Sequence, residues 1–227
     1  MKEPLTMITV FGEGRGFRVV WLLEEMGLPY RLRPVDMLAG VENDPEFLAI
    51  NPGGFIPAIQ DGDVTMVESI AIMEFLIARY GHESKSAAPL APAPNDPAFA
   101  AYQQFLHLGE AGLAASVFFV LGARKFAPAA DRDNWTARQA LGVYESRLRL
   151  VTRQLARAPH MAGAAFTAAD ISVTYALNLA RSGAGIALGA AEQAYMTRTT
   201  SRDAYKRALE TCQATKAWLA RTSGLST

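Results

Sequence analysis

A proline-rich stretch divides the chain into two halves whose hydrophobic patterns differ. Residues 82–96 read HESKSAAPLAPAPND, and together with the next residue they hold four of the twelve prolines in the 227-residue chain. Because proline fixes φ and removes a backbone donor, such a stretch is typical of an extended, semi-rigid linker. We therefore predict two domains, residues 1–81 and 97–227, joined by the linker 82–96 and each long enough to bury its own core.

The first domain alternates strand patterns with helical patterns. Strand-like runs of apolar and β-branched residues fall at 7–11, 30–35, 56–60 and 64–67. Helical spacing of apolar residues falls at 17–26, 45–51 and 69–80. Asp61-Gly62 lies between the last two strand patterns, as in a hairpin turn, and Ser69 is a residue type that caps helices. The order β-α-β-α-β-β-α predicts an α/β domain with a mixed sheet covered by helices.

The second domain shows helical patterns alone. We predict helices at 97–123, 134–157, 168–181, 187–197 and 202–220. Thr167 and Asp170 stand three residues apart at the start of the third, which predicts a capping box with Asp in place of the usual Glu. The residues that follow are apolar on nearly all sides, so this helix should be buried at the centre of an all-α bundle.

Composition excludes several classes of protein. The chain is 50% apolar and 19% charged, which is typical of a folded protein and not of a disordered one. No apolar run approaches the roughly 20 residues that span a bilayer, and the first four residues do not resemble a secretory signal. One cysteine, Cys212, and three separated histidines favour neither a disulfide nor a metal site. We expect a cytoplasmic protein without a membrane partner or a bound metal.

Charge is divided in the same place as the hydrophobic pattern. Residues 1–81 hold six Lys and Arg against twelve Asp and Glu, a formal −6, whereas residues 82–227 hold sixteen against ten, a formal +6. The basic residues are spread along predicted helices without interleaved aromatic residues. Solvated helix faces therefore explain them better than a nucleic-acid surface does, and we expect no nucleic-acid partner.

Five motifs in collinear order resemble those of cytosolic glutathione S-transferases. They are WLLEEMGLPY at 21–30, NPGGFIPA at 51–58, VESIAI at 67–72, FTAADI at 166–171 and RDAYKRA at 202–208. The resemblance covers nearly the whole chain and implies a thioredoxin-like βαβαββα domain followed by a helical bundle, usually in a homodimer. It also implies glutathione as co-substrate, a hydrophobic electrophile as second substrate, and a role in detoxification.

The same resemblance implies roles for residues of the first domain. Glu68 would pair with the γ-glutamyl ammonium of glutathione, and Ser69 with the helix N–H groups beside it would bind the γ-glutamyl carboxylate. Pro57 matches a cis-proline that exposes the backbone of Ile56 to the cysteinyl part of the ligand. Phe55 stands where the family often has Lys or Gln, so it offers no ionic contact to the glycine carboxylate.

The turn that usually carries the family's catalytic Ser, Tyr or Cys departs from the pattern. Residues 11–18 read FGEGRGFR, without a hydroxyl or a thiol, and we expect Cys212 to be buried far from this turn. A guanidinium and helix N-terminal amides both lower the pKa of a thiol. We predict that Arg15, with the amides around Gly14 to Phe17, binds glutathione and stabilises its thiolate. The alternative is that the glycines only form the turn and Arg15 is a surface cation.

Two functions are compatible with these residues. The first is a glutathione S-transferase-like enzyme that activates the thiol of glutathione, either for conjugation to an electrophile or for glutathione-dependent reduction. In this case His107 and Glu110 would line the electrophile pocket from one helix face. His107 and Glu110 could instead form a simple surface pair. The second is a non-catalytic binding or interaction protein of the same fold. The missing hydroxyl favours the second function, whereas the intact Ile56-Pro57 and Glu68-Ser69 elements favour the first.

Overall fold

The structure is a computed structural model that describes residues 7–37 and 39–215. These residues divide into two units, which are considered separately. The first unit holds 7–87 together with 203–215, and the second holds 88–202. The division after Ala87 falls inside the predicted linker. Residues 203–215, however, belong to the first unit, whereas the sequence pattern predicted them in the helical domain.

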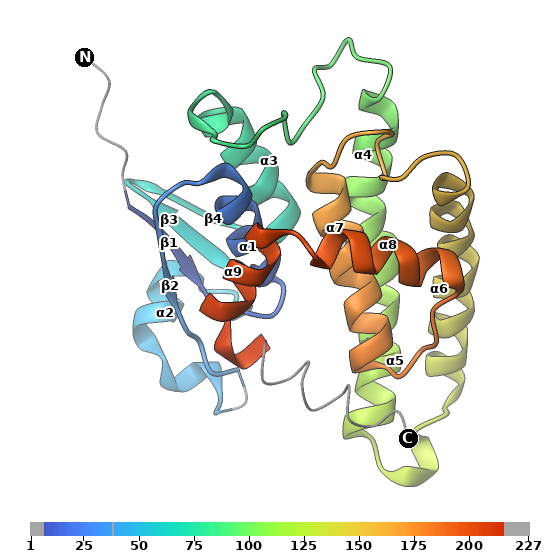
Figure 1. The fold of residues 1–227 in the computed structure, drawn as a ribbon. Coiled ribbons are helices and arrows are strands. Elements are labelled where there is room, and N and C mark those ends of the chain that lie inside the picture. Colours follow the sequence, from blue (N-terminus) through green and yellow to red (C-terminus); the bar gives the residue numbers. More distant parts are fainter. Residues whose placement is uncertain (1–6, 38, 216–227) are drawn as a thin grey trace. The chain divides into compact units, whose positions relative to one another are not determined.

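A four-stranded mixed sheet forms the centre of the first unit (Figure 1). Its strands are β1 (Ile8–Phe11), β2 (Tyr30–Arg33), β3 (Ala58–Asp61) and β4 (Val64–Val67), in the order β2-β1-β3-β4. β1 pairs in parallel with β2 and antiparallel with β3, and its residues are almost fully buried. The parallel pair needs a crossover connection, which α1 provides. The predicted mixed sheet and hairpin are confirmed.

Three helices predicted for the first unit are present. They are α1 (Gly16–Met26), α2 (Pro45–Ile50) and α3 (Ser69–Tyr80), with the short 3₁₀ turns η1 (Val41–Asn43) and η2 (Gly81–Glu83). α1 ends at Gly27, which has φ +63 and closes the helix in the left-handed conformation. The Asp44 carboxylate caps α2 by accepting from the N–H of Phe47 at 3.0 Å. α3 begins at Ser69 as predicted, but Glu68 occupies the N-cap position, so the expectation that Ser69 is the cap was wrong.

α9 (Asp203–Thr211) packs on α1 within the first unit. Tyr205 is buried and meets Phe17 and Trp21 edge-on, with ring centroids 5.4 Å and 4.9 Å away. Such aromatic contacts bury large areas, and they explain why this helix belongs to the first unit. The predicted helix 202–220 ends at Thr211, and its part beyond residue 215 lies outside the described residues.

The described part of the second unit is built from helices (Figure 1). They are α4 (Phe99–His107), η3 (Leu108–Ala114), α5 (Ala115–Phe126), η4 (Ala129–Asp131), α6 (Trp135–Leu155), α7 (Ala168–Asn178), η5 (Leu179–Gly183) and α8 (Ala190–Thr200). α7 is buried almost throughout, as predicted for a central helix. It approaches the π-helix η3 closely, because a Cβ added to Gly109 would lie 2.3 Å from the Oγ of Ser172.

α4, η3 and α5 form one helical run, Phe99–Phe126. This run has 28 residues and is long and apolar enough, by length and composition, to cross a membrane. The sequence prediction, which considered only uninterrupted apolar runs, did not anticipate it. Half of its most apolar window is buried inside the unit, and a core helix has the same length and composition. The run therefore fits a helix packed against α7.

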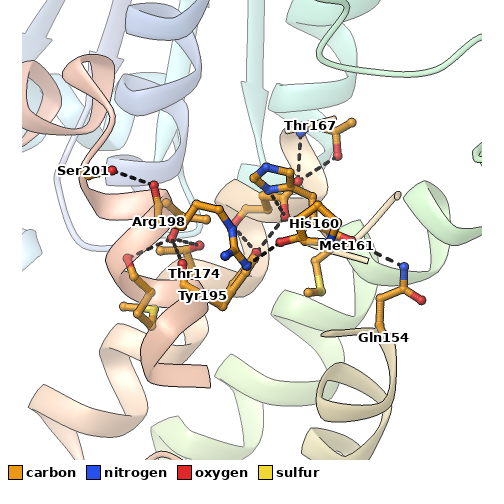
Figure 2. Close-up of polar contacts among 12 residues, drawn as sticks. Gln154, His160, Met161, Thr167, Thr174, Tyr195, Arg198 and Ser201 are labelled. Carbon is orange, nitrogen blue, oxygen red and sulfur yellow. Dashed lines mark hydrogen bonds and ion pairs between the residues drawn. The ribbon is translucent and has the colours of Figure 1, made fainter. Parts of the chain in front are cut away.

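Asp170 organises the start of α7, and Figure 2 shows the polar contacts in this region. Its fully buried carboxylate accepts from the N–H groups of Met161 and Thr167 and from the hydroxyl of Tyr195, each at 2.9 Å. The Thr167 side chain accepts from the backbone of Asp170, which completes the predicted capping box. Burial raises the pKa of Tyr195, and the nearby Asp170 carboxylate raises it further. One acid therefore joins α7, α8 and the loop before α7.

Candidate functional site

The glycine-rich turn after β1 packs directly against the Ile56-Pro57 dipeptide. Gly12 has φ +81, and a Cβ on it would lie 2.3 Å from the Cγ2 of Ile56, so only glycine fits there. A Cβ on Gly16 would lie 3.2 Å from the Cβ of Pro57. The Ile56–Pro57 peptide bond is cis, as the resemblance implied. The turn and the loop before β3 therefore meet in one place within the first unit.

Asn51 holds the loop that leads to this dipeptide. Its side chain is buried, its amide donates to the carbonyl of Phe55 at 2.6 Å, and its oxygen accepts from the N–H of Gly53 at 3.0 Å. Phe55 is 41% exposed, and Ile56 is half-buried. The ring can therefore offer apolar contact to a ligand, whereas a hydrogen bond would have to come from the backbone.

A buried arginine that sequence reasoning missed connects α1 to the start of α3. Arg18 is fully buried, and its Nη1 donates to the Oγ of Ser69 at 3.2 Å. Because the Ser69 oxygen accepts from a guanidinium, the hydroxyl hydrogen is left to donate to another group. The sequence does contain a signal for a buried Arg18. It is followed on the same helix by a run of apolar residues, Val19 to Leu23, which the structure buries.

Glu68 stands immediately before Ser69 and is exposed. With φ +71 and ψ 104, it is the one non-glycine residue with positive φ among residues 7–37 and 39–215. Such a backbone conformation costs on the order of 1–3 kcal/mol and occurs disproportionately at binding sites. The arrangement places an exposed carboxylate beside the first N–H groups of α3 and the Ser69 hydroxyl. A zwitterionic amino-acid group, with one charge of each sign, matches this chemistry.

The glycine-rich turn uses two of the amides that were predicted to face a thiol. The N–H of Gly16 donates to the carbonyl of Glu13 at 2.8 Å, and the N–H of Phe17 donates to the carbonyl of Gly14 at 3.1 Å. The Phe17 ring is buried against aromatic neighbours, so it is not presented to a ligand. Gly14 is exposed and Arg15, the N-cap of α1, is half-buried. These two residues carry the exposed part of the turn.

Cys212 lies beside this turn, which corrects the expectation that it is far away. Glu13, within the turn, accepts from the N–H groups of Ala214 and Thr215. Cys212 is fully buried as predicted, and burial raises the pKa of its thiol, with the carboxylates of Glu13 and Glu24 raising it further. A buried, protonated thiol is a poor nucleophile. Cys212 therefore does not replace the missing catalytic group.

The two residues predicted for an electrophile pocket lie in the second unit. His107 is the exposed last residue of α4, and Glu110 is half-buried in η3. Because η3 is a π-helix, the two residues do not have the regular α-helical relation that the sequence prediction assumed. π-Helical turns occur frequently at functional sites. Over the described ranges of the chain, no group of three His, Cys, Asp or Glu side chains is arranged to hold a metal ion.

The chain is similar in sequence and in fold to known proteins. The family model described as glutathione S-transferase, N-terminal domain, matches residues 16–79. The chain is 31% identical to glutathione S-transferase 3 of Zea mays over 157 residues, which cover 67% of this chain and 68% of the maize protein. The chain belongs to the glutathione S-transferase family.

Two further relatives illustrate the range of the similarity. Glutathione S-transferase-like protein gedE of Aspergillus terreus is 46% identical over 82 residues, which cover 34% of this chain and only 35% of that relative. The crystal structure of the theta class glutathione S-transferase of Xanthomonas axonopodis pv. citri, with glutathione bound, is 25% identical and has a TM-score of 0.75. The structural match covers 90% of this chain and 97% of the Xanthomonas chain. The chain thus has the predicted thioredoxin-like domain together with a mostly helical remainder.

Proposed function

We propose that this glutathione S-transferase family member binds glutathione through its first unit and activates the thiol for attack on an electrophilic small molecule. The observation that carries the proposal is the arrangement of Glu68, Ser69 and Arg18 at the start of α3. It is supported by the Xanthomonas relative, whose structure has glutathione bound. Glutathione enters here as the co-substrate.

In this proposal the start of α3 binds the γ-glutamyl end of glutathione. The exposed Glu68 carboxylate pairs with the ammonium group, and the γ-glutamyl carboxylate accepts from the Ser69 hydroxyl and the first N–H groups of the helix. Arg18 lies behind Ser69 and donates to its oxygen, so the guanidinium polarises the hydroxyl toward the carboxylate. The positive φ at Glu68 turns its side chain away from the regular helical direction.

The remainder of glutathione lies along the loop and the turn. The backbone of Ile56 pairs with the cysteinyl part, and Phe55 offers apolar contact near the glycine end. The sulfur lies at the exposed face of Gly14 and Arg15, where the Arg15 guanidinium and the turn's amides favour the thiolate. The thiolate then forms a bond to an electrophilic carbon. The thiol proton passes to solvent when the thiolate forms. In substitution the leaving group departs with the electron pair of the bond that breaks, and in addition to a double bond the second carbon takes a proton from solvent.

The second unit supplies the pocket for the electrophile in this proposal, with His107 and Glu110 among its lining residues.

We propose further that the protein is a cytoplasmic homodimer with a role in detoxification, as the family resemblance implies. Support for an interface comes from aromatic side chains on α5 and at the start of α6 that are 52–76% exposed: Phe118, Phe119, Phe126 and Trp135. Sedimentation of wild type and Phe119→Glu checks the dimer, which the charged variant should weaken.

A second function is favoured by one specific observation. Residues 11–18 hold no hydroxyl or thiol, and Cys212 beside them is buried with a raised thiol pKa. A protein with this turn could bind glutathione and act through other contacts without transferring it. Turnover of several electrophile classes separates the two functions, because binding without turnover in all of them supports the non-catalytic one.

Ser69→Ala tests the proposed binding mode. A charge-assisted hydrogen bond is worth about 1.5–3 kcal/mol, so the dissociation constant for glutathione should rise roughly 10- to 100-fold. Calorimetric titration measures the change, with Ser201→Ala, at the exposed end of α8, as the matched control. Unchanged affinity in Ser69→Ala removes Ser69 from the site.

A further inference from the structure

The acid in the glycine-rich turn is bonded to a segment at the other end of the sequence. Glu13 Oε1 accepts from the N–H of Ala214 at 3.2 Å, and Oε2 accepts from the N–H of Thr215 at 2.7 Å. Both carboxylate oxygens are therefore engaged by two consecutive backbone amides. Hydrogen bonds to an ionised acceptor are roughly twice as strong as neutral ones. The contact joins the turn of the candidate site to the chain just after α9.

α9 is attached to α1 by contacts that do not involve Glu13. The Nε of Arg207 donates to the Glu24 carboxylate at 2.6 Å, and Nη2 donates to the Glu24 backbone carbonyl at 3.1 Å. The hydroxyl of Tyr30 donates to the same carboxylate at 2.7 Å and lies 3.3 Å from the Oγ1 of Thr211. These contacts hold α9 in place against α1. The amides of Ala214 and Thr215, just after α9, therefore meet the turn in a defined position.

Glu13 is held on its backbone side as well. Its carbonyl accepts from the N–H of Gly16 at 2.8 Å, at the beginning of α1. The exposed Gly14 and the half-buried Arg15 lie between the Glu13 carbonyl and the Gly16 N–H. Because Glu13 is bonded through both its carbonyl and its carboxylate, its backbone orientation is fixed. That orientation determines where Gly14 and Arg15 lie. The neighbouring glycines have positive φ and would otherwise allow many directions.

We propose that Glu13 is a positioning residue for the glutathione thiol. Its bonds to Ala214 and Thr215 hold the turn in the geometry in which Arg15 and the turn's amides stabilise the thiolate. The inference rests on the proposed function of the same site and adds a residue and a segment to it. In this view the segment after α9 supports the reaction without contacting glutathione.

The charge of Glu13, taken alone, predicts the opposite effect. A carboxylate near a thiolate raises the pKa of the thiol, so removing the carboxylate would lower that pKa. Loss of positioning would raise it, because Arg15 and the amides would no longer meet the sulfur together. The direction of the shift in a Glu13 variant therefore separates a positioning role from a purely electrostatic one.

Full-length variants test the proposal. Glu13→Ala removes the acceptor, and Thr215→Pro removes the N–H that donates at 2.7 Å without changing any charge. Both should raise the pKa of bound glutathione by about one unit and lower kcat/KM at neutral pH about tenfold. The double variant should resemble either single variant, because all three lack the same interaction.

Gln213→Pro, which spares both donating amides, is the matched control and should behave as wild type. The thiolate absorbance reports the pKa, and circular dichroism confirms that each variant is folded.

Three results would overturn the positioning role. They are an unchanged or lowered thiol pKa in Glu13→Ala, wild-type behaviour of Thr215→Pro, and additive effects in the double variant. Hydrogen exchange gives a readout without glutathione, since the amides of Ala214 and Thr215 should exchange slowly in wild type and faster in Glu13→Ala. If wild type binds no glutathione in calorimetry, the proposed function fails and the positioning role with it. Slow hydrogen exchange at Ala214 and Thr215 would then still demonstrate their hydrogen bonds to Glu13.

Discussion

Asp170 and Glu13 are two carboxylates with the same kind of bonding and different surroundings. Each accepts from two backbone N–H groups, Asp170 from Met161 and Thr167, and Glu13 from Ala214 and Thr215. Asp170 is fully buried, and its two backbone donors lie within nine residues in sequence. Glu13 is half-buried and its partners lie 201 and 202 residues away.

The difference teaches what each acid contributes. A buried polar group without a hydrogen-bond partner lowers the free energy of unfolding by its full desolvation penalty. This holds for a carboxylate that loses its donors and for donors that lose their carboxylate. Asp170 therefore contributes chiefly to the stability of the second unit. Water can replace Glu13 at its partners, so its bonds contribute less to stability. They instead determine the local geometry of a turn whose glycines leave it otherwise adaptable.

The largest effect expected from this comparison is on Asp170. In Asp170→Ala the buried donors of Met161, Thr167 and Tyr195 lose their acceptor, and the free energy of unfolding should fall by at least about 3 kcal/mol. Glu13→Ala should cost about 1 kcal/mol or less, and Glu145→Ala, an exposed acid on α6, about 0.5 kcal/mol or less. Urea unfolding measures all three. Equal losses for Asp170→Ala and Glu13→Ala would contradict the comparison.

An intermediate effect is expected on the reactivity of Cys212. Its thiol is buried with a raised pKa, so a thiol reagent should modify the native protein slowly at pH 8. Glu13→Ala should speed the modification by roughly tenfold, because local opening of the segment after α9 becomes easier. The reagent's absorbance follows the rate, and Glu145→Ala provides the control. An unchanged rate in Glu13→Ala would show that the segment does not depend on Glu13.

The smallest effect is expected for Asp44, a half-buried carboxylate at the start of α2. The Arg33 guanidinium, bonded to it at 2.5 and 2.8 Å, and the N–H of Phe47 lower the pKa of Asp44. A lowered folded-state pKa stabilises the native state above the unfolded value of about 3.9, and this stabilisation is lost as the pH falls through the folded-state pKa. Asp44→Asn should therefore be less stable than wild type at pH 6, and the difference should shrink as the pH falls below the unfolded-state value and through the folded-state pKa. Urea midpoints across this range would reject the idea if the difference stayed constant.

The elements that sequence patterns predicted correctly are local in the chain. Gly27 at the end of α1, the Asp61-Gly62 hairpin and the Thr167–Asp170 capping box all depend on groups a few residues apart. Their residue types therefore carry the information needed. The central position of α7 also followed from its apolar character on nearly all sides.

The candidate site was predictable only where family motifs name its residues. The Ile56-Pro57 and Glu68-Ser69 elements were found in this way, although Ser69 is the first helical residue and not the cap. Arg18 belongs to no motif considered, and its role depends on a hydrogen bond to a residue 51 positions away. Cys212 was expected far from the turn because it was assigned to the helical domain, and the packing of Tyr205 on α1 was not foreseen.

By itself, the sequence determined which segments become strands and helices, where several of them end, and to which family the chain belongs. Hydrophobic periodicity, turn residues and capping residues act within a few positions, so they can be read along the chain. Only the tertiary structure decided that α9 completes the first unit and that Glu13 meets Ala214 and Thr215. The physical reason is that such contacts depend on how aromatic and apolar faces pack between distant segments, and no local pattern encodes that choice.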